Sequence, residues 1–129
     1  MADSVILDKS FEFAKRVVRL YKYLIKKRIY ILAKQVLRSG TAIGANVTEA
    51  IGAQSKKDFI AKIFIALKEA RETSYWLRLL YECDYMEHKH FQSIHEDCTE
   101  LVRMLSATVI TSRKSDPAEK PEKMKTKSP

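Results

Sequence analysis

Apolar residues recur alternately three and four positions apart along four stretches of this chain. That spacing places side chains on one face of an α-helix and is typical of helices that pack in a bundle. The first two predicted helices cover residues 4–27 and 29–51. Their inner faces comprise Leu7, Phe11, Ala14, Val18, Tyr21 and Ile25 in the first, and Leu32, Val36, Ile43, Val47 and Ile51 in the second.

The third predicted helix has the clearest start in the sequence. Ser55 followed by Asp58 can form a capping box, in which the serine oxygen accepts a hydrogen bond from a backbone N–H three residues later. The inner faces of the last two helices comprise Ile60, Ile63, Leu67, Ala70, Ser74, Leu77 and Tyr81, and then Phe91, Ile94, Cys98, Leu101, Leu105 and Val109. Short connections between long helices predict an all-α fold, an antiparallel up-down-up-down four-helix bundle.

One bundle domain is expected over residues 1–114. From 115 to 129 the chain is rich in lysine and proline, which favours a disordered basic tail. Only three glycines and three prolines among 129 residues leave few signals for the tight turns that an all-β fold needs, which favours helices. No run of about 18 apolar residues could span a membrane, and the N-terminus does not resemble a secretory signal. Two cysteines form no disulfide framework, so we expect a reduced, cytoplasmic protein.

All three glycines fall between residues 38 and 52. In an antiparallel hairpin of the second and third helices, Gly40 would lie opposite Leu67 and Gly44 opposite Ile63. Bare backbone at Gly40 and Gly44 would then let the third helix pack closely, while Gly52 would close the second helix in a left-handed conformation. A phosphate-binding loop is the alternative, but no strand precedes these glycines and no Lys-Ser pair follows them.

The sequence around these glycines resembles a known family, the four-helix bundle proteins also called 23S ribosomal RNA intervening-sequence proteins. The resemblance covers residues 4–110 and is most specific from Gln35 to Leu80. The segments that carry it read SFEFAKRVVRLYKYL and QVLRSGTAIGANVTEAIGAQSKKDFIAKIFIALKEARETSYWLRLL. The family's Asn-x-x-Glu element falls on Asn46 and Glu49, for which we expect a polar contact across a helix or subunit interface. Where the family often has Glu-Gly, this chain has Glu49-Ala50.

The resemblance implies a bacterial cytoplasmic bundle that assembles into a homopentamer. A related branch, the accessory variability proteins of diversity-generating retroelements, forms pentameric basic barrels that bind nucleic acid and reverse transcriptase. Both partners are therefore implied for this chain, together with a biochemical role that is poorly defined across the family.

No pattern of catalytic residues stands out, so we expect no enzyme and no cofactor. His95 and Cys98, three positions apart, could bind zinc together with His88 or His90. However, Cys98 belongs to the predicted inner face, and His88 and His90 lie in a polar loop. We therefore interpret this region as a solvated loop beside a buried cysteine, with no metal.

Basic residues give the stronger functional signal. Through Tyr30 the chain carries eight lysines and arginines against three acids, whereas residues 87–112 carry two basic and four acidic residues. The net charge of +8 favours polyanionic partners. Tyr23 and Tyr30 lie among the basic side chains, where bases could stack; Arg16, Tyr23 and Lys27 are expected to face away from the core. The candidate nucleic-acid-binding residues are Lys15, Arg16, Arg19, Lys22, Lys26, Lys27 and Arg28. A solvated helix face without a ligand is the alternative.

Three apolar residues of the third helix are predicted to point away from the core: Ile65, Trp76 and Leu79. A monomeric bundle would leave them in water, so we expect an oligomer interface there. In the alternative, Trp76 packs across the mouth of its own bundle.

Two functions remain open at the level of sequence. The first is a non-enzymatic, oligomeric scaffold that binds RNA or DNA through backbone charge. The second is a protein-interaction scaffold that engages an acidic partner, such as a reverse transcriptase.

Overall fold

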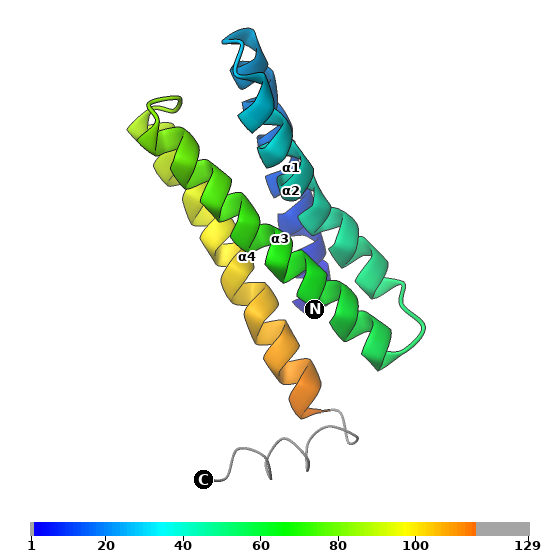
Figure 1. The fold of residues 1–129 in the computed structure, drawn as a ribbon. Helices are drawn as coiled ribbons and strands as arrows, with labels where there is room; N and C mark the ends of the chain where they lie inside the picture. The colour runs from blue at the N-terminus through cyan, green and yellow to red at the C-terminus, as the bar shows by residue number, and fades with distance from the viewer. Residues whose placement is uncertain (1, 116–129) are drawn as a thin grey trace, which may run out of the picture.

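The protein folds into the four predicted helices in a computed structural model that describes residues 2–115 (Figure 1). Consecutive helices pack side by side in opposite directions, and α1 meets α4 to close the bundle. The helices are α1 (Ala2–Lys26), α2 (Tyr30–Ile51), α3 (Lys56–Glu82) and α4 (His88–Lys114). The predicted disordered tail lies, from residue 116 onward, outside the described residues.

Side chains from all four helices form one hydrophobic core. In α4 the predicted inner face from Ile94 to Val109 is confirmed, with each of its members at most 5% exposed. In α2, Ile51 is 42% exposed and Ala50 takes the buried position, so the prediction was wrong at the last turn. The predicted start of α3 is confirmed, because the Ser55 hydroxyl accepts a hydrogen bond from the Asp58 N–H at 3.1 Å.

The buried face of α1 differs from the predicted one by a single position. Phe11 is 63% exposed and Val18 is 37% exposed, although both were expected in the core. The residues that reach the core are Ile6, Ser10, Phe13, Val17, Leu20 and Leu24, a face rotated by about 100°. This row is hard to recognise in the sequence because the polar residue Ser10 interrupts it. In the fold its hydroxyl donates to the Leu7 carbonyl at 3.1 Å, which makes its burial tolerable.

Gly40 and Gly44 lie where α2 meets α1, and not where it meets α3 as predicted. A Cβ atom on Gly40 would lie 2.7 Å from a side-chain carbon of Val17, and one on Gly44 would lie 3.3 Å from the Ser10 carbonyl oxygen. A middle helix has two neighbours, and hairpin spacing alone does not tell which of them a given face meets. Gly52 has a φ of −86°, so the predicted left-handed cap is also wrong.

Candidate nucleic-acid interface

The turn from α1 to α2 carries three consecutive basic residues, Lys26 to Arg28. Helix α1 ends there in a Schellman motif, since the Arg28 N–H donates to the Ile25 carbonyl and the Ile29 N–H to the Leu24 carbonyl, both at 3.0 Å. Arg28 holds the left-handed position of the motif with a φ of 64°, where glycine is the least strained residue. The chain therefore reverses tightly and leaves all three basic side chains exposed at the end of the hairpin.

The turn from α3 to α4 repeats this backbone geometry with the opposite charge. Asp84 has a φ of 65°, its N–H donates to the Tyr81 carbonyl at 3.0 Å, and the Tyr85 N–H donates to the Leu80 carbonyl at 2.8 Å. Three acids lie in or beside this turn, namely Glu82, Asp84 and Glu87. Both turns lie at the same end of the molecule (Figure 1). That end therefore presents one basic and one acidic hairpin.

Five of the seven predicted binding residues make no ion pair with a described side chain: Arg19, Lys22, Lys26, Lys27 and Arg28. The first three follow one exposed row of α1, roughly opposite its buried face. Lys15 continues this row but pairs with Glu12 of the same helix at 3.1 Å. Both partners are largely exposed, so the pair is weak. Uncompensated positive charge thus concentrates in the second half of α1 and in the turn.

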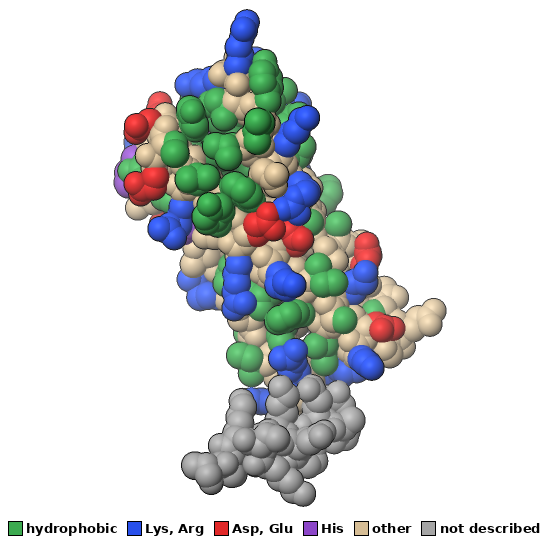
Figure 2. Space-filling model, viewed as in Figure 1, with side chains coloured by type: hydrophobic (Ala, Val, Ile, Leu, Met, Phe, Trp, Pro, Cys, Tyr) green, Lys and Arg blue, Asp and Glu red, His purple; other side chains and the backbone are tan. Residues whose placement is uncertain are grey.

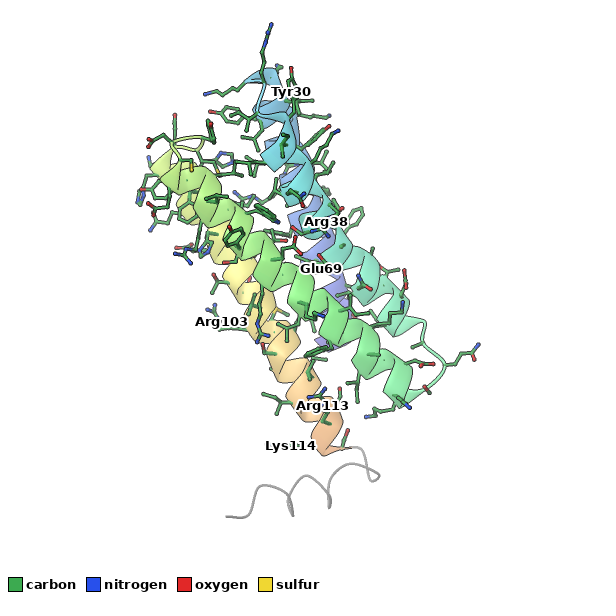
Figure 3. All side chains as sticks on the ribbon, viewed as in Figure 1. Tyr30, Arg38, Glu69, Arg103, Arg113 and Lys114 are labelled. Carbon is green, nitrogen blue, oxygen red and sulfur yellow. The ribbon has the colours of Figure 1, made fainter. Side chains whose placement is uncertain are left out.

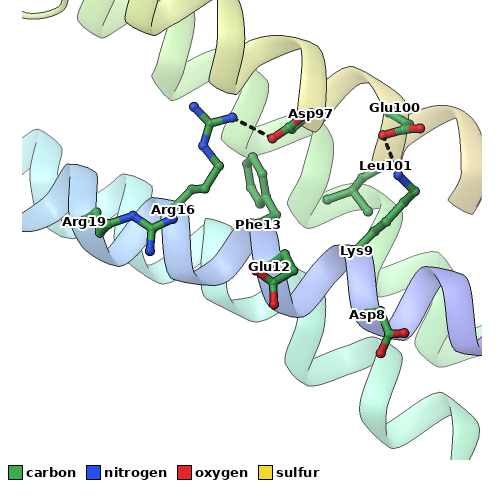
Figure 4. A pocket seen from close by; sticks show the side chains of 9 residues that line it. All are labelled: Asp8, Lys9, Glu12, Phe13, Arg16, Arg19, Asp97, Glu100 and Leu101. Carbon is green, nitrogen blue, oxygen red and sulfur yellow. Dashed lines mark hydrogen bonds and ion pairs between the residues drawn. The ribbon is translucent and has the colours of Figure 1, made fainter.

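Arg16 does not face away from the bundle, contrary to the prediction. Its guanidinium donates to the Asp97 carboxylate at 2.6 Å and to the Ser93 hydroxyl at 3.1 Å, both on α4. A second ion pair joins Lys9 to Glu100 at 3.2 Å. The two pairs bridge α1 and α4 across a slot of about 330 Å³ (Figure 4). Because Asp97 neutralises its charge, Arg16 belongs to this helix contact and not to the basic surface.

The two tyrosines predicted to stack on bases have different surroundings. Tyr23 is half-buried against the core, with the Lys27 ammonium 4.7 Å from its ring centroid and the His90 ring edge-on at 6.4 Å. Tyr23 also raises the pKa of the Lys27 ammonium. Tyr30, the first residue of α2, is 54% exposed. Among the described residues no aromatic ring or cation packs on its ring.

Lys34 of α2 is an exposed basic residue near this turn that was not among the predicted binding residues. It follows Tyr30 by four positions, so the two side chains share one face of α2. Lys34 is exposed and forms no ion pair within residues 2–115. The spacing to Tyr30 is the signal that could have identified it.

The predicted oligomer residues lie along the edge of α3 that borders α2. Ile65 is 39% exposed, whereas Trp76 and Leu79 are half-buried. The Trp76 indole N–H donates to Glu72 at 2.9 Å, and Trp76 packs against the core. Arg38 of α2 reaches across to pair with Glu72 and Glu69; Figure 3 shows Arg38 and Glu69 side by side. These contacts favour the alternative interpretation of Trp76, in which it packs on its own bundle.

Hydrophobic side chains nevertheless gather on this side of the molecule, over the upper part of α2 and α3 (Figure 2). On these two helices Ile31 is 78% exposed and Tyr75 is 55% exposed. A second apolar surface, which was not predicted from the sequence, is a recess of about 580 Å³ between α1 and α2. The exposed ring of Phe11 contributes to one wall. The remaining lining residues are Leu7, Asp8, Ala14, Thr41, Gly44, Ala45 and Thr48.

The histidines near α4 do not assemble with the cysteines. No group of three or more potential metal ligands occurs within residues 2–115. His95 lies 2.9 Å from the Ser74 hydroxyl, and burial, followed by the charge of Arg78, lowers the pKa of its imidazole. Glu49 pairs with Lys62 of α3 at 2.6 Å, which confirms its predicted contact across helices, whereas the Asn46 amide donates to the Ala42 carbonyl of its own helix.

The fold and this surface define a small antiparallel four-helix bundle with one strongly basic hairpin end. The chain belongs to the 23S rRNA-intervening sequence protein family, whose model matches residues 2–107. No curated protein matches the sequence. None of the helices formed by residues 2–115 is long and apolar enough to cross a bilayer.

Among solved structures, the chain is similar to a protein of unknown function from the S23 ribosomal protein family of Bacteroides thetaiotaomicron VPI-5482. The two sequences are 50% identical, and the structures superpose with a TM-score of 0.83. The match covers 84% of this chain and 98% of the relative. The likeness therefore extends over the whole bundle.

Proposed function

We propose that this protein is a non-enzymatic, oligomeric scaffold that binds RNA or DNA through the basic end of the α1–α2 hairpin. The observation that carries the proposal is a group of four cations, Arg19, Lys22, Lys26 and Arg28, that have neither an ion-pair partner nor a cation–π contact in the described chain. Three of these charges follow one row of α1 and the fourth lies in the turn directly after it, so their potentials add. Contacts from such side chains to phosphates read backbone charge and carry no base sequence.

An oligomer strengthens this function, because symmetry repeats the basic surface in every copy. The apolar surface of α2 and α3 and the recess between α1 and α2 lie on different parts of the same chain. A cyclic assembly pairs two such different surfaces at each contact. We therefore assign the α3 edge of one copy to the recess of the next, and favour a ring of five as the resemblance implies.

Salt dependence of binding tests the proposal. Affinity for a mixed-sequence RNA or DNA should fall with the logarithm of the salt concentration, with a slope of about −3 to −4 if four phosphates per subunit are neutralised. Fluorescence anisotropy at several salt concentrations measures this slope. An acidic protein that binds where nucleic acid does not would instead favour the protein-interaction scaffold.

Charge reversal locates the surface. The variant with Arg19, Lys22, Lys26 and Arg28 all changed to Glu should lose binding. A matched control reverses four other exposed cations without ion pairs among the described residues, Lys57, Lys68, Arg71 and Arg103, and so makes the same change in net charge. Equal loss in both variants would show only a response to net charge and would overturn the assignment to this hairpin end.

A further inference from the structure

We infer that the α1–α2 hairpin end selects single-stranded nucleic acid, with the Tyr30 ring stacking on an unpaired base between cations that hold the flanking phosphates. This inference rests on the proposed function and goes beyond it, because backbone charge alone does not distinguish single strands from duplexes. Tyr30 lies at the extreme end of the hairpin, far from Arg113 and Lys114 at the other end of the bundle (Figure 3).

The ring of Tyr30 is open to a ligand in a way that its neighbours are not. It is 54% exposed, whereas Tyr23 is half-buried between Lys27 and His90. Beside it, Ile31 is 78% exposed and offers an apolar surface to a base or sugar. A base that stacks on an aromatic side chain must be free of its own helical stack, so a duplex interior cannot use this ring.

Cations flank the ring on both sides along the chain. Arg28 precedes Tyr30 by two positions, and Lys34 follows it by one helical turn on the same face. Neither forms an ion pair with a described side chain. An aromatic platform between uncompensated cations is the arrangement with which proteins bind single strands irrespective of sequence.

The α3–α4 turn serves as an internal comparison, because it has the same backbone geometry but acidic side chains where the α1–α2 turn has basic ones. Tyr85 is 40% exposed, and like Tyr30 it has no aromatic ring or cation packed on it among the described residues. The charged neighbours of the two tyrosines differ, however. Tyr30 comes two positions after Arg28, whereas Tyr85 comes directly after Asp84 and lies between Glu82 and Glu87. These carboxylates repel phosphate, so an exposed tyrosine at this turn should not bind nucleic acid.

The test compares a labelled single strand of about 12 nucleotides with the duplex of the same sequence, at one salt concentration, by fluorescence anisotropy. The parent protein should bind the single strand more tightly. Tyr30→Ala should weaken single-strand binding by about 5- to 150-fold and leave duplex binding unchanged. Tyr30→Phe, which keeps the ring, should retain most of the affinity, and the matched control Tyr85→Ala should behave as the parent.

Arg28→Gly and Asp84→Gly form a second matched pair. Both relieve a left-handed backbone position and should raise the unfolding midpoint, so a loss of binding cannot be attributed to unfolding. Only Arg28→Gly should weaken binding. Salt-sensitive binding with equal affinity for single strand and duplex, unaffected by Tyr30→Ala, would overturn the stacking inference and leave the proposed function standing. Absence of binding to both probes would overturn both.

Discussion

The backbone of Gly40 in α2 lies so close to Val17 in α1 that a Cβ atom there would be 2.7 Å from one Val17 methyl carbon and 2.8 Å from the other. No ordinary carbon–carbon contact is that short, so any side chain at position 40 would force the Val17 side chain or α1 itself to move. Val17 is fully buried, which leaves its methyl groups little room to move. The separation of α1 and α2 is therefore set at this pair.

Gly40→Ala should destabilise the fold by about 1–3 kcal/mol, because overpacking outweighs the gain of about 1 kcal/mol in helix propensity. Urea unfolding measures the change. Val17→Ala removes both methyl groups, so adding it to Gly40→Ala should recover part of the loss. If the two substitutions are simply additive, the close contact does not limit the packing of α1 on α2.

Gly52→Ala should have the opposite effect. Its φ of −86° suits any residue, and a Cβ there would lie 3.8 Å or more from its nearest neighbours, in ordinary contact. Alanine reduces the entropy of the unfolded chain, so the free energy of unfolding should rise by about 0.4–1 kcal/mol. A loss of stability in the same urea experiment would contradict this geometry.

The two cysteines should differ sharply in reactivity. Burial raises the pKa of Cys98 to about 12, and its thiol lies 3.3 Å from the Ala70 carbonyl, whereas Cys83 is exposed. Because the thiolate is the nucleophile, iodoacetamide should modify Cys83 alone in the native protein and both thiols in urea. Mass spectrometry distinguishes the two products. Native Cys83→Ser protein should therefore remain unmodified, and rapid labelling of it would contradict the burial of Cys98.

Stability should decline in mild acid because of His95. Its pKa is below the usual 6.5 in the fold, so the unfolded chain takes up a proton first as the pH falls. The stabilising contribution is complete above about pH 6.5 and is lost as the pH falls toward the folded-state pKa. Urea midpoints measured across this range should show the decline, and His95→Gln should remove it. His90→Gln, at an exposed position, serves as the control and should follow the parent.

Oligomer formation should depend on the two apolar surfaces. Light scattering coupled to gel filtration should give the parent protein a mass well above its monomer mass of 14.9 kDa. Phe11→Glu and Ile65→Glu should each lower that mass, because a carboxylate would be buried at the contact.

Trp76→Glu is a poorer probe of the interface, since it would place a second acid beside Glu72 and break a packed contact with the core. Ile110→Glu alters a similarly exposed apolar residue of α4 and should leave the mass unchanged. A monomeric parent would overturn the oligomer, and a dimer would overturn the ring of five.

Periodicity predicted the four helices because each carries a long apolar stripe, and it predicted the inner face of α4 because no polar residue interrupts that stripe. It misplaced the inner face of α1, where two adjacent rows are both largely apolar and the buried row contains Ser10. It also could not separate free cations from paired ones. Arg16 pairs with Asp97, which lies 81 positions later in the sequence, and Lys9 pairs with Glu100, which lies 91 positions later. The neutralisation of these two charges is therefore visible only in the folded structure. The predicted cations that remain without an ion pair are recognisable from the sequence as basic but not as uncompensated; they are Arg19, Lys22, Lys26, Lys27 and Arg28.

The slot between α1 and α4 has a consequence for how the bundle forms and opens. The three most extensive helix contacts in the described chain join neighbours along the sequence, and α1 packs less extensively on α4 than any of those pairs do on each other. Bringing α1 to α4, as in the Lys9–Glu100 pair, closes a longer loop than any contact between consecutive helices, so this step carries a larger entropic cost of closure. The two hairpins should therefore form before α1 meets α4. Local opening of the native protein should separate α1 from α4 at this slot, with the contact between α2 and α3 as the hinge. The amide hydrogens of α1 should therefore exchange with solvent before those of α3.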